Sequence, residues 1–269
     1  MRVIIFCDLE NFKHSIIKLY PEGSYVELLY SHFHHFLFNM VMEKIGGKIY
    51  NPRMIRTYIY TGEYNDAQID QAKKHQRFLP ADQSKIERDI KRLEEALNST
   101  TTSYEKNRLI RTLENKKRRV FSPDRILALS YEISSAEKRK KAQTETFNEI
   151  SRVDLLELKT KPLKYSRKDL RFVQKGTDVQ LAVDLVNYAH FNNYDVAIVC
   201  SGDLDLMESL NQIKSLGKTV VLVSHKSMVS PVMVKISDYF IDLSCLTNGE
   251  KSQISATGGY APTSNQVPG

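Results

Sequence analysis

Residues 194–206 read YDVAIVCSGDLDL, and the fold can be worked out from this segment. Val196 to Cys200 are apolar and mostly β-branched, without polar alternation, which is typical of a strand buried on both faces of a parallel sheet. Ser201-Gly202 then indicates a turn, and Asp203-Leu-Asp205 opens a helical pattern. Two carboxylates are therefore predicted at the carboxyl end of a central strand, where open α/β sheets bind their ligands.

An aspartate at the start of a helix also has an ordinary structural role. Its side chain caps free backbone N–H groups and complements the helix dipole. Capping would account for a single aspartate at this place. Two of them, Asp203 and Asp205, directly after Ser-Gly at the end of a buried strand, favour a metal or phosphate site instead.

Composition narrows the class of protein. The chain has 269 residues, 41% hydrophobic and 26% charged, which is enough for one large domain or one domain with an insertion. A formal net charge of +7 favours a polyanionic partner, above all nucleic acid. The three cysteines show neither CxxC nor zinc spacing, and no secretory signal or membrane-spanning run is apparent. We therefore expect a soluble, cytoplasmic protein with reduced thiols and no membrane partner.

Two further acids follow the same logic. Residues 2–7 predict a second buried strand, and Asp8-Leu-Glu-Asn11 comes directly after it. Asp178 falls on the apolar face of a predicted helix, in its first turn, where a carboxylate costs free energy unless a cap or a cation satisfies it. Further strands are expected at residues 54–60 and 218–224. Alternating strands and helices predict an α/β fold with a mostly parallel sheet flanked by helices.

Residues 64–148 have a different character, being highly charged and without glycine. Apolar residues recur at helical spacing on both sides of a polar break at residues 98–103. Ser84-x-x-Glu87 and Thr102-x-x-Glu105 resemble capping boxes, and Ser122-Pro123 is a further helix start. We predict a charged helical hairpin plus a third helix, inserted into the sheet. Its apolar seam could pack internally or against a second copy, giving a homodimer.

Basic residues gather in three clusters, which are candidates for binding RNA phosphates. A solvated helix face is the ordinary explanation of such clusters, and a phosphate-contacting arm is the functional one. Lys175, just before the Asp178 helix, could also contact a phosphate. Two clusters lie in the insertion, Lys116, Lys117, Arg118 and Arg119 and then Lys138, Arg139, Lys140 and Lys141, and the third, Arg167 and Lys168, lies in a loop-like segment after it.

The topology can bring four aspartates together. Carboxylates held close to one another repel, which raises their pKa values or requires a cation. Hard oxygen ligands suit Mg²⁺ or Mn²⁺, and such a metal can activate a water and stabilise a leaving oxygen. The residues therefore favour metal-assisted hydrolysis of phosphodiester bonds at Asp8, Asp178, Asp203 and Asp205.

Four blocks of the sequence resemble the NYN domain, of the LabA-like type, which is grouped with the PIN-like nucleases. They are Asp8–Asn11, Lys175–Val179, Ser201–Asp205 and Ser237–Asp242. The resemblance covers residues 1–62 and 150–245 and implies a PIN-like (Rossmannoid) catalytic domain there. Residues 64–148 would then be a basic helical insertion, and residues 247–269, rich in Gly, Ser, Thr, Pro and Gln, a disordered tail.

The resemblance also implies roles for residues. Asp8, Asp178, Asp203 and Asp205 match the metal-binding acids of the family, Asn11 its polar partner, and Ser201 the residue that arranges the acids. The implied activity is divalent-metal-dependent cleavage of RNA. The sequence departs from the family pattern without losing a carboxylate, and the change at position 9 could narrow the mouth of the site; the departures are Leu9, Leu204 and Leu206.

Two hypotheses from different classes follow. The first is a Mg²⁺- or Mn²⁺-dependent endoribonuclease that acts on single-stranded or structured RNA. The second is a non-catalytic RNA-binding or adaptor protein, in which the acids bind metal structurally or not at all. A haloacid-dehalogenase-like phosphatase is disfavoured, because that class needs an aspartate where Glu10 stands. A dinucleotide enzyme is disfavoured by the lack of a Gly-rich loop after the first strand.

Overall fold

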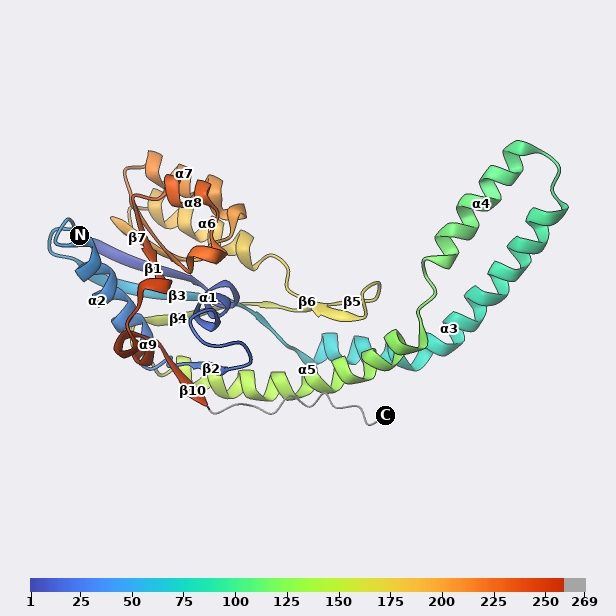
Figure 1. Ribbon diagram of the computed structural model, residues 1–269, viewed down its shortest axis with the longest axis horizontal. Coiled ribbons are helices and arrows are strands. Elements are labelled where there is room, and N and C mark those ends of the chain that lie inside the picture. Colours follow the sequence, from blue (N-terminus) through green and yellow to red (C-terminus); the bar gives the residue numbers. More distant parts are fainter. Residues whose placement is uncertain (259–269) are drawn as a thin grey trace. The chain divides into compact units, whose positions relative to one another are not determined.

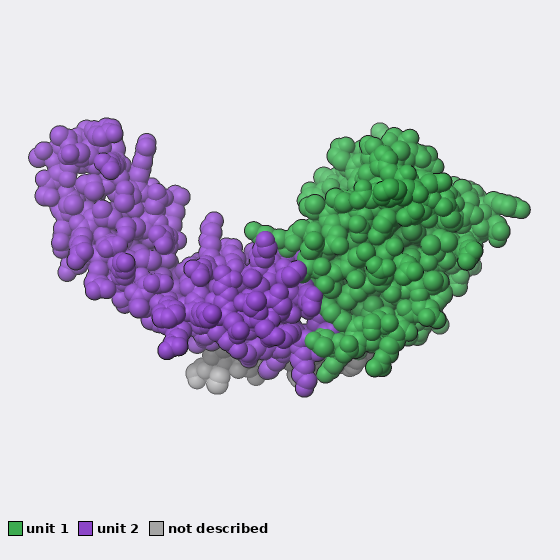
Figure 2. Space-filling view, turned by 180° about the vertical axis from the view of Figure 1, so that it is seen from behind, with its two compact units in different colours: residues 1–62, 144–161, 175–269 green, residues 63–143, 162–174 purple. Residues whose placement is uncertain are grey.

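The computed structural model describes residues 1–258, and these form two compact units (Figures 1 and 2). Unit 1 comprises residues 1–62, 144–161 and 175 onward, and unit 2 comprises residues 63–143 and 162–174. The expected boundaries therefore need one correction. Residues 162–174 belong with the helical insertion, because a hairpin in this segment packs into the core of that unit.

Unit 1 is built on a six-stranded sheet in the order β4-β3-β1-β7-β8-β9. The pairings from β3 through β9 are all parallel, so the mostly parallel α/β sheet predicted from the sequence is confirmed. The two central strands, β1 and β7, place Cys7 beside Cys200. Their next residues, Asp8 and Ser201, therefore emerge together at the carboxyl edge of the sheet. The bounds are β1 Arg2–Asp8, β3 Arg53–Glu63, β4 Leu156–Pro162, β7 Val196–Cys200, β8 Thr219–Ser224 and β9 Tyr239–Asp242.

Alternate side chains of the central strands enter two separate hydrophobic cores, one on each face of the sheet. In β1, Ile5 and Cys7 pack into the first core, and Ile4 and Phe6 into the second. Burial on both faces explains the unbroken apolar pattern of these strands. The first core is covered by α1 (Leu9–Ile17) and α2 (Phe33–Ile45), and the second by α6 (Thr177–His190), α7 (Met207–Ser215) and α8 (Pro231–Ile236).

The expected disordered tail is wrong for residues 247–258. Helix α9 (Asn248–Ile254) begins with a capping box in which the Thr247 side chain and Glu250 satisfy each other's backbone N–H groups. Ile254 at its end is buried in the first core. Strand β10 (Ser255–Gly258) then pairs antiparallel with β2 (Tyr25–Leu28). Residues 259–269 lie outside the described part of the chain.

Unit 2 contains the helices predicted for the insertion, together with a small hairpin. The helices are α3 (Asp66–Ser99), α4 (Ser103–Lys117) and the first part of α5 (Pro123–Ile150), and the hairpin strands are β5 (Lys164–Ser166) and β6 (Arg171–Val173). Helix α3 continues through Pro80 and Ser84, so the capping box expected at Ser84 is wrong. Thr102 is the N-cap residue of α4, and its hydroxyl donates to the Glu105 carboxylate over 2.6 Å.

The apolar seam of the insertion packs within the chain. Helices α3 and α4 lie against each other, with the apolar residues of their shared face half-buried. Two ion pairs join the helices, Lys116 with Asp89 and Lys117 with Glu94, at 2.5 Å and 2.7 Å. This internal packing favours the first of the two expected uses of the seam, and nothing in the described residues supports the homodimer. In residues 1–258, no helix has the length and apolar character needed to cross a membrane.

Candidate active site

Asp8 is the centre of the candidate site. It ends β1 and is also the N-cap of α1, so the capping role and the site role coincide in one residue. Its Oδ1 accepts a hydrogen bond from the backbone N–H of Asn11 at 3.2 Å, and its Oδ2 accepts one from the Ser201 hydroxyl at 3.3 Å. Only 5% of the residue is exposed. Each oxygen keeps a further lone pair, because a carboxylate can accept about four hydrogen bonds.

The pKa of Asp8 is raised to about 6. Burial is the largest cause, and the charges of Asp178 and Asp203 add to it, while the hydrogen bonds from Asn11 and Ser201 act in the opposite direction. The raised pKa means that the ionised carboxylate is held in the fold at a free-energy cost. A cation bound beside it would relieve both the burial penalty and the repulsion.

The loop after β7 is tied to the loop after β1 by a short hydrogen-bond network. The backbone N–H of Gly202 donates to Asn11 Oδ1 at 2.9 Å, and the backbone N–H of Asp203 donates to Ser201 Oγ at 3.2 Å. Asp203 in turn caps a short 3₁₀ helix, residues 204–206, by accepting from the N–H of Asp205 at 3.0 Å. Asn11 and Ser201 thus fix the positions of two loops whose bonded residues, Asn11 and Gly202, are 191 residues apart in sequence.

Gly202 is needed for a different reason from the one the sequence suggested. A Cβ atom built there would lie 2.0 Å from the carbonyl oxygen of Met228 and 3.0 Å from Ser224 Oγ. The backbone of the short 3₁₀ helix at residues 226–228 therefore passes directly over this position. Close packing of two backbones, rather than the turn itself, requires glycine between Ser201 and Asp203.

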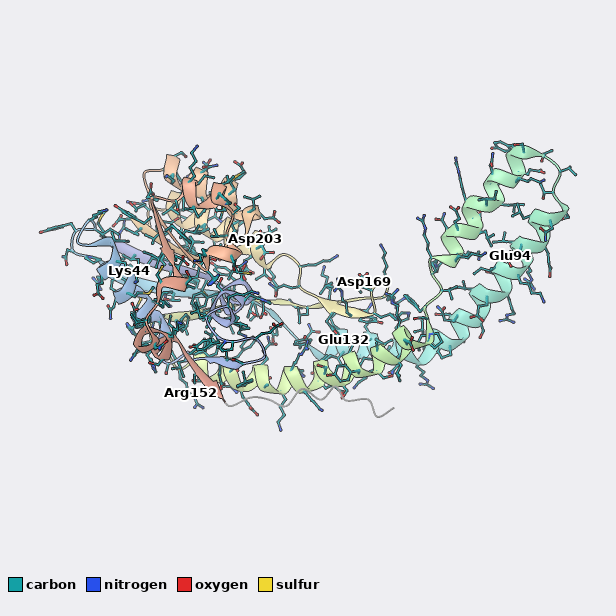
Figure 3. The ribbon with its side chains drawn as sticks, in the orientation of Figure 1. Lys44, Glu94, Glu132, Arg152, Asp169 and Asp203 are labelled. Atoms are coloured by element: carbon teal, nitrogen blue, oxygen red, sulfur yellow. The ribbon has the colours of Figure 1, made fainter. Side chains whose placement is uncertain are left out.

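Asp178 and Asp205 complete the acidic cluster. Asp178 is half-buried in the first turn of α6, and its pKa is raised by burial and then by the charges of Asp203 and Asp205. The structure thus brings all four predicted aspartates into one electrostatically coupled cluster; Figure 3 labels Asp203. At the same helix start, the buried hydroxyl of Thr177 has no hydrogen-bond partner among the described residues.

The donor atoms of the cluster suit a hard divalent cation, but the cluster does not form a complete set of metal ligands. The donors are carboxylate oxygens, which Mg²⁺ and Mn²⁺ prefer. Within residues 1–258, however, no three His, Cys, Asp or Glu side chains are drawn together closely enough to hold a metal ion by themselves. Mg²⁺ does not require such a cage, because it usually keeps several waters and binds through one or two carboxylates plus substrate phosphates.

A groove of about 500 Å³ starts at Asp178 and Asp205 and follows α6 and α7. Its walls are apolar on the α6 side, where Val179 and Val183 are 65% and 49% exposed. Glu208, on the α7 side of the groove, was not predicted from the sequence, although it follows Asp205 by three residues. The rim of this groove is rich in hydrogen-bond acceptors.

Other acids near strand ends have structural partners. Asp184, on α6, accepts a hydrogen bond from the Tyr60 hydroxyl at 2.9 Å. Asp238 pairs with Lys214 at 2.7 Å, and Asp242 accepts from the backbone and hydroxyl of Ser244. The acids of the fourth sequence block, Asp238 and Asp242, therefore hold β9 in place and do not join the cluster.

The predicted basic residues divide between the two units. Lys175 is exposed in unit 1, two residues before α6. Arg167 and Lys168 lie in the turn of the β5–β6 hairpin, next to Asp169, which Figure 3 labels. They line one pocket of unit 2 together with part of the first predicted cluster, Lys116, Arg118 and Arg119. Lys117 does not line that pocket.

Comparison with known proteins finds one family and one solved structure that are similar to the chain. The family model of the NYN domain matches residues 125–244, which include Asp178, Ser201, Asp203 and Asp205. Asp8 and Asn11 precede the match, and the structure joins them to it through Ser201 and Gly202. No curated protein matches the chain. A crystal structure of a protein of unknown function from Vibrio parahaemolyticus is similar over 90% of this chain and 92% of its own, with 13% identity and a TM-score of 0.45.

The NYN match indicates a nuclease-like, RNA-related function at the level of the family, whose members typically use divalent metals. The four acids that the family resemblance singled out are those that the sheet brings together. Residues 125–244 are therefore similar to the NYN domain, a family that is grouped with the PIN-like nucleases.

Proposed function

We propose that the protein is a cytoplasmic, Mg²⁺- or Mn²⁺-dependent ribonuclease that cleaves RNA internally at the acidic cluster. The observation that carries this proposal is the buried carboxylate of Asp8, whose pKa is raised to about 6 by burial and by its acidic neighbours. A buried ionised carboxylate weakens the folded state. Such groups are concentrated at functional sites, and a bound cation would offset this cost. The NYN match supports RNA as the substrate class.

Each residue of the cluster then has a role. Asp8, Asp178 and Asp203 hold the metal, and Asp205 either completes its coordination or orients the attacking water. Asn11 and Ser201 position Asp8 against the β7 loop through the hydrogen bonds described above. Lys175 contacts a substrate phosphate. A divalent metal held by these carboxylates would supply an activated water and charge stabilisation for the leaving oxygen.

The groove between α6 and α7 suits a nucleobase rather than a phosphate. Beyond the acids proposed to bind the metal, its rim carries Glu208, which repels a phosphodiester, while the valine side chains offer an apolar surface to a neutral ring. The acceptors of the rim complement the amino groups of adenine, cytosine or guanine. We therefore place the scissile phosphate at the acids and a neighbouring base in the groove.

The test is a cleavage assay on the full chain with single-stranded and hairpin RNA, in Mn²⁺, Mg²⁺ or EDTA. We expect cleavage only with metal, and a loss of at least about 100-fold in Asp203→Asn, because metal activation contributes several kcal/mol to the transition state. Asp70→Asn, an exposed aspartate of unit 2, is the matched control and should cleave normally. Unchanged cleavage in Asp203→Asn would remove the assignment.

A non-catalytic RNA-binding or adaptor protein is the second candidate. It is favoured by the lack of a closed three-ligand metal group in residues 1–258 and by the basic pocket of unit 2. RNA binding that persists in EDTA, with no cleavage in either metal, would support it. Titration with Mn²⁺, followed by electron paramagnetic resonance, would then show whether the acids of this non-catalytic protein bind a structural metal or no metal at all.

A further inference from the structure

Unit 2 contains a second candidate binding site, a pocket of about 580 Å³. It lies between α3, α4 with the segment that follows it, and the turn of the β5–β6 hairpin. Every lining residue belongs to unit 2, so the pocket is described within that unit alone. The cations that line it come from three separate segments: Lys85, Lys116, Arg118, Arg119, Arg167 and Lys168.

Most of these cations lack an anionic partner. Lys116 pairs with Asp89 at 2.5 Å, but none of the other five forms an ion pair within residues 1–258. All five are exposed. Elsewhere in the unit, Lys73, Lys117 and Lys140 are paired with carboxylates. With Asp89 neutralised by Lys116, one acid of the pocket wall, Asp82, remains to offset five free positive charges.

The backbone that carries these cations is held by hydrogen bonds from two side chains, Gln83 and Arg125. Gln83, which is 7% exposed, donates to the carbonyl oxygen of Arg119 at 3.3 Å and accepts from the N–H of Phe121 at 2.9 Å. Arg125 then reaches from the start of α5 to the carbonyl oxygen of Lys168 at 3.3 Å. Its guanidinium stacks on the Phe121 ring at 4.9 Å. The segments bearing Arg119 and Lys168 are thus linked through Phe121 and Arg125.

His75 adds a neutral polar group to the pocket wall. Its Nδ1 lies 2.8 Å from the Tyr165 hydroxyl, and its pKa is lowered, first by burial and then by the charge of Arg167. The imidazole is therefore uncharged at neutral pH, and the positive charge of the pocket comes from lysine and arginine alone. That charge persists over the whole physiological pH range.

The ligand that this pocket fits is a chain of phosphates. Several free cations on a fixed backbone repel one another and are stabilised by a polyanion that spans them. Three of the five are arginines, whose planar guanidinium groups bind phosphate oxygens in pairs. The volume of the pocket exceeds what one phosphate group needs and is in the range of about 300–1,000 Å³ typical of sites for larger ligands.

We propose that this pocket binds the phosphate backbone of RNA through Lys85, Arg118, Arg119, Arg167 and Lys168. The choice of RNA as the polyanion rests on the function proposed above, but the binding itself does not depend on catalysis. The pocket gives the helical insertion a function of its own, that of an RNA-anchoring site. It also divides the basic cluster of α4, because Arg118 and Arg119 belong to the site and Lys117 does not.

The experiment uses the full chain carrying Asp203→Asn, in EDTA, so that neither metal nor cleavage contributes. Binding of fluorescent single-stranded and hairpin RNA is measured by anisotropy at several salt concentrations. The pocket variant combines Arg118→Gln, Arg119→Gln and Arg167→Gln. The control removes the same number of charges from exposed positions of α4 outside the pocket, through Lys106→Gln, Arg108→Gln and Arg111→Gln.

We expect the pocket variant to bind RNA about 10- to 100-fold more weakly and to lose about two units of salt slope, because each phosphate contact contributes roughly 0.7 to 0.9. The control variant should change the affinity by less than about threefold. Equal losses in both variants would overturn the proposal, because the binding would then depend on net charge alone. Unchanged binding in the pocket variant would overturn it as well.

A second measurement maps the contact without any substitution. Acetylation of lysines in the presence of RNA should be slowed at Lys85 and Lys168 and unchanged at Lys106. Acetylation of Lys85 and Lys168 at the rate of the free protein would overturn the proposal. Competition by inorganic phosphate or adenosine monophosphate distinguishes the source of the phosphate. Displacement of RNA by either at low millimolar concentration would overturn the proposal in favour of a small phosphorylated ligand.

Failure of this proposal and failure of the proposed function give different results. A protein that cleaves RNA with metal but binds equally well in the pocket variant retains the nuclease and loses the anchoring site. A protein that never cleaves, but loses RNA binding in the pocket variant, retains the site and supports the RNA-binding alternative.

Discussion

The acidic cluster of unit 1 and the basic pocket of unit 2 differ in how far their charged groups are buried. Asp8 is 5% exposed and hydrogen-bonded on both oxygens, and its pKa is raised to about 6. The five free cations of the pocket are all exposed, and none of them forms an ion pair within residues 1–258. The negative charge of the first region is thus buried at a free-energy cost, whereas the positive charges of the second are exposed to solvent.

The difference shows how strongly each region should depend on single residues. A buried carboxylate among like charges changes its protonation, and the stability of the fold, when one neighbour changes. Exposed cations act through a field that salt screens and that several residues share. Substitutions in unit 1 should therefore have large and specific effects, whereas those in unit 2 should be gradual and depend on salt.

The largest effect is expected from Asp8→Asn, which should lower metal-dependent cleavage by at least about 100-fold. The same change should make the metal-free protein more stable. In the fold, the Asp8 pKa is about 6, above its ordinary value of 3.8, so the penalty for ionisation develops as pH rises between these values and is complete above them. At pH 8, a neutral asparagine avoids it and should raise the free energy of unfolding by about 1–3 kcal/mol.

Urea denaturation of the metal-free protein at pH 4 and pH 8 measures this gain, which should be small at the lower pH. Asp242→Asn is the opposite control, because burial around Asp242 is outweighed by hydrogen bonds that lower its pKa. That variant should be less stable at pH 8. A loss of stability in Asp8→Asn at pH 8 would show that the cluster is not strained by its own charge.

The next largest effect is expected at Gly202, in the loop that positions Asp203. Gly202→Ala would place a methyl group 2.0 Å from the Met228 carbonyl oxygen, so that one of two backbones must shift. We expect a destabilisation of about 1–3 kcal/mol, together with reduced cleavage, because Asp203 follows directly. Gly249→Ala in α9 is the matched control, since its nearest neighbour would be the Thr247 hydroxyl at 4.0 Å. Equal melting temperatures for the two variants would mean that the loop after β7 adapts without strain.

A smaller effect, of about tenfold per pH unit, should separate the two regions by their pH dependence. Asp8 must lose its proton to bind a cation, so affinity for Mn²⁺ should fall as pH drops below about 6 and be constant above it. RNA binding in EDTA should stay constant from about pH 6 to pH 8, because lysine and arginine keep their charge there. Titrations followed by Mn²⁺ paramagnetic resonance and by RNA anisotropy test both expectations. If Mn²⁺ affinity and RNA affinity changed with pH in the same way, the two regions would not differ in their pH dependence.

The sequence predicts the acid cluster well because its causes are local and repeated. A strand buried on both faces shows as an unbroken apolar run, and acids at its end fall where parallel sheets bind ligands. Asp8 and Asp203 each follow such a run. The bonds that tie them together, through Ser201 and Asn11, join segments far apart in the chain. No spacing in the sequence shows such contacts, and the family resemblance was needed to propose these two residues.

Features that depend on packing partners were missed. Gly202 was interpreted as a turn residue, although its requirement comes from the backbone at Met228. The tail was expected to be disordered from its composition, although Thr247-x-x-Glu250 forms a capping box and Ile254 is buried. The capping pattern Thr247-x-x-Glu250 predicts a helix start, whereas the composition of the tail predicts disorder, and the capping pattern is the one that holds. The capping box expected at Ser84 failed in the opposite way, since a continuous helix passes through it.

The smallest predicted effect concerns Lys117, which the sequence does not distinguish from its neighbours in the basic run 116–119. Lys117 pairs with Glu94 at 2.7 Å, and both side chains are about half exposed, at 54% and 46%. An exposed pair of this kind contributes at most about 1 kcal/mol, and Lys117 does not line the pocket.

Lys117→Gln should therefore change RNA affinity by less than about twofold and the stability of unit 2 by less than about 1 kcal/mol. Arg118→Gln, one residue further on, should weaken RNA binding several-fold, because its charge has no partner and faces the pocket. Anisotropy titrations of the two single variants at the same salt concentration make the comparison. If Lys117→Gln weakened binding as much as Arg118→Gln, the run of basic residues would act as a continuous charged face, and the pocket would have no special part in holding RNA.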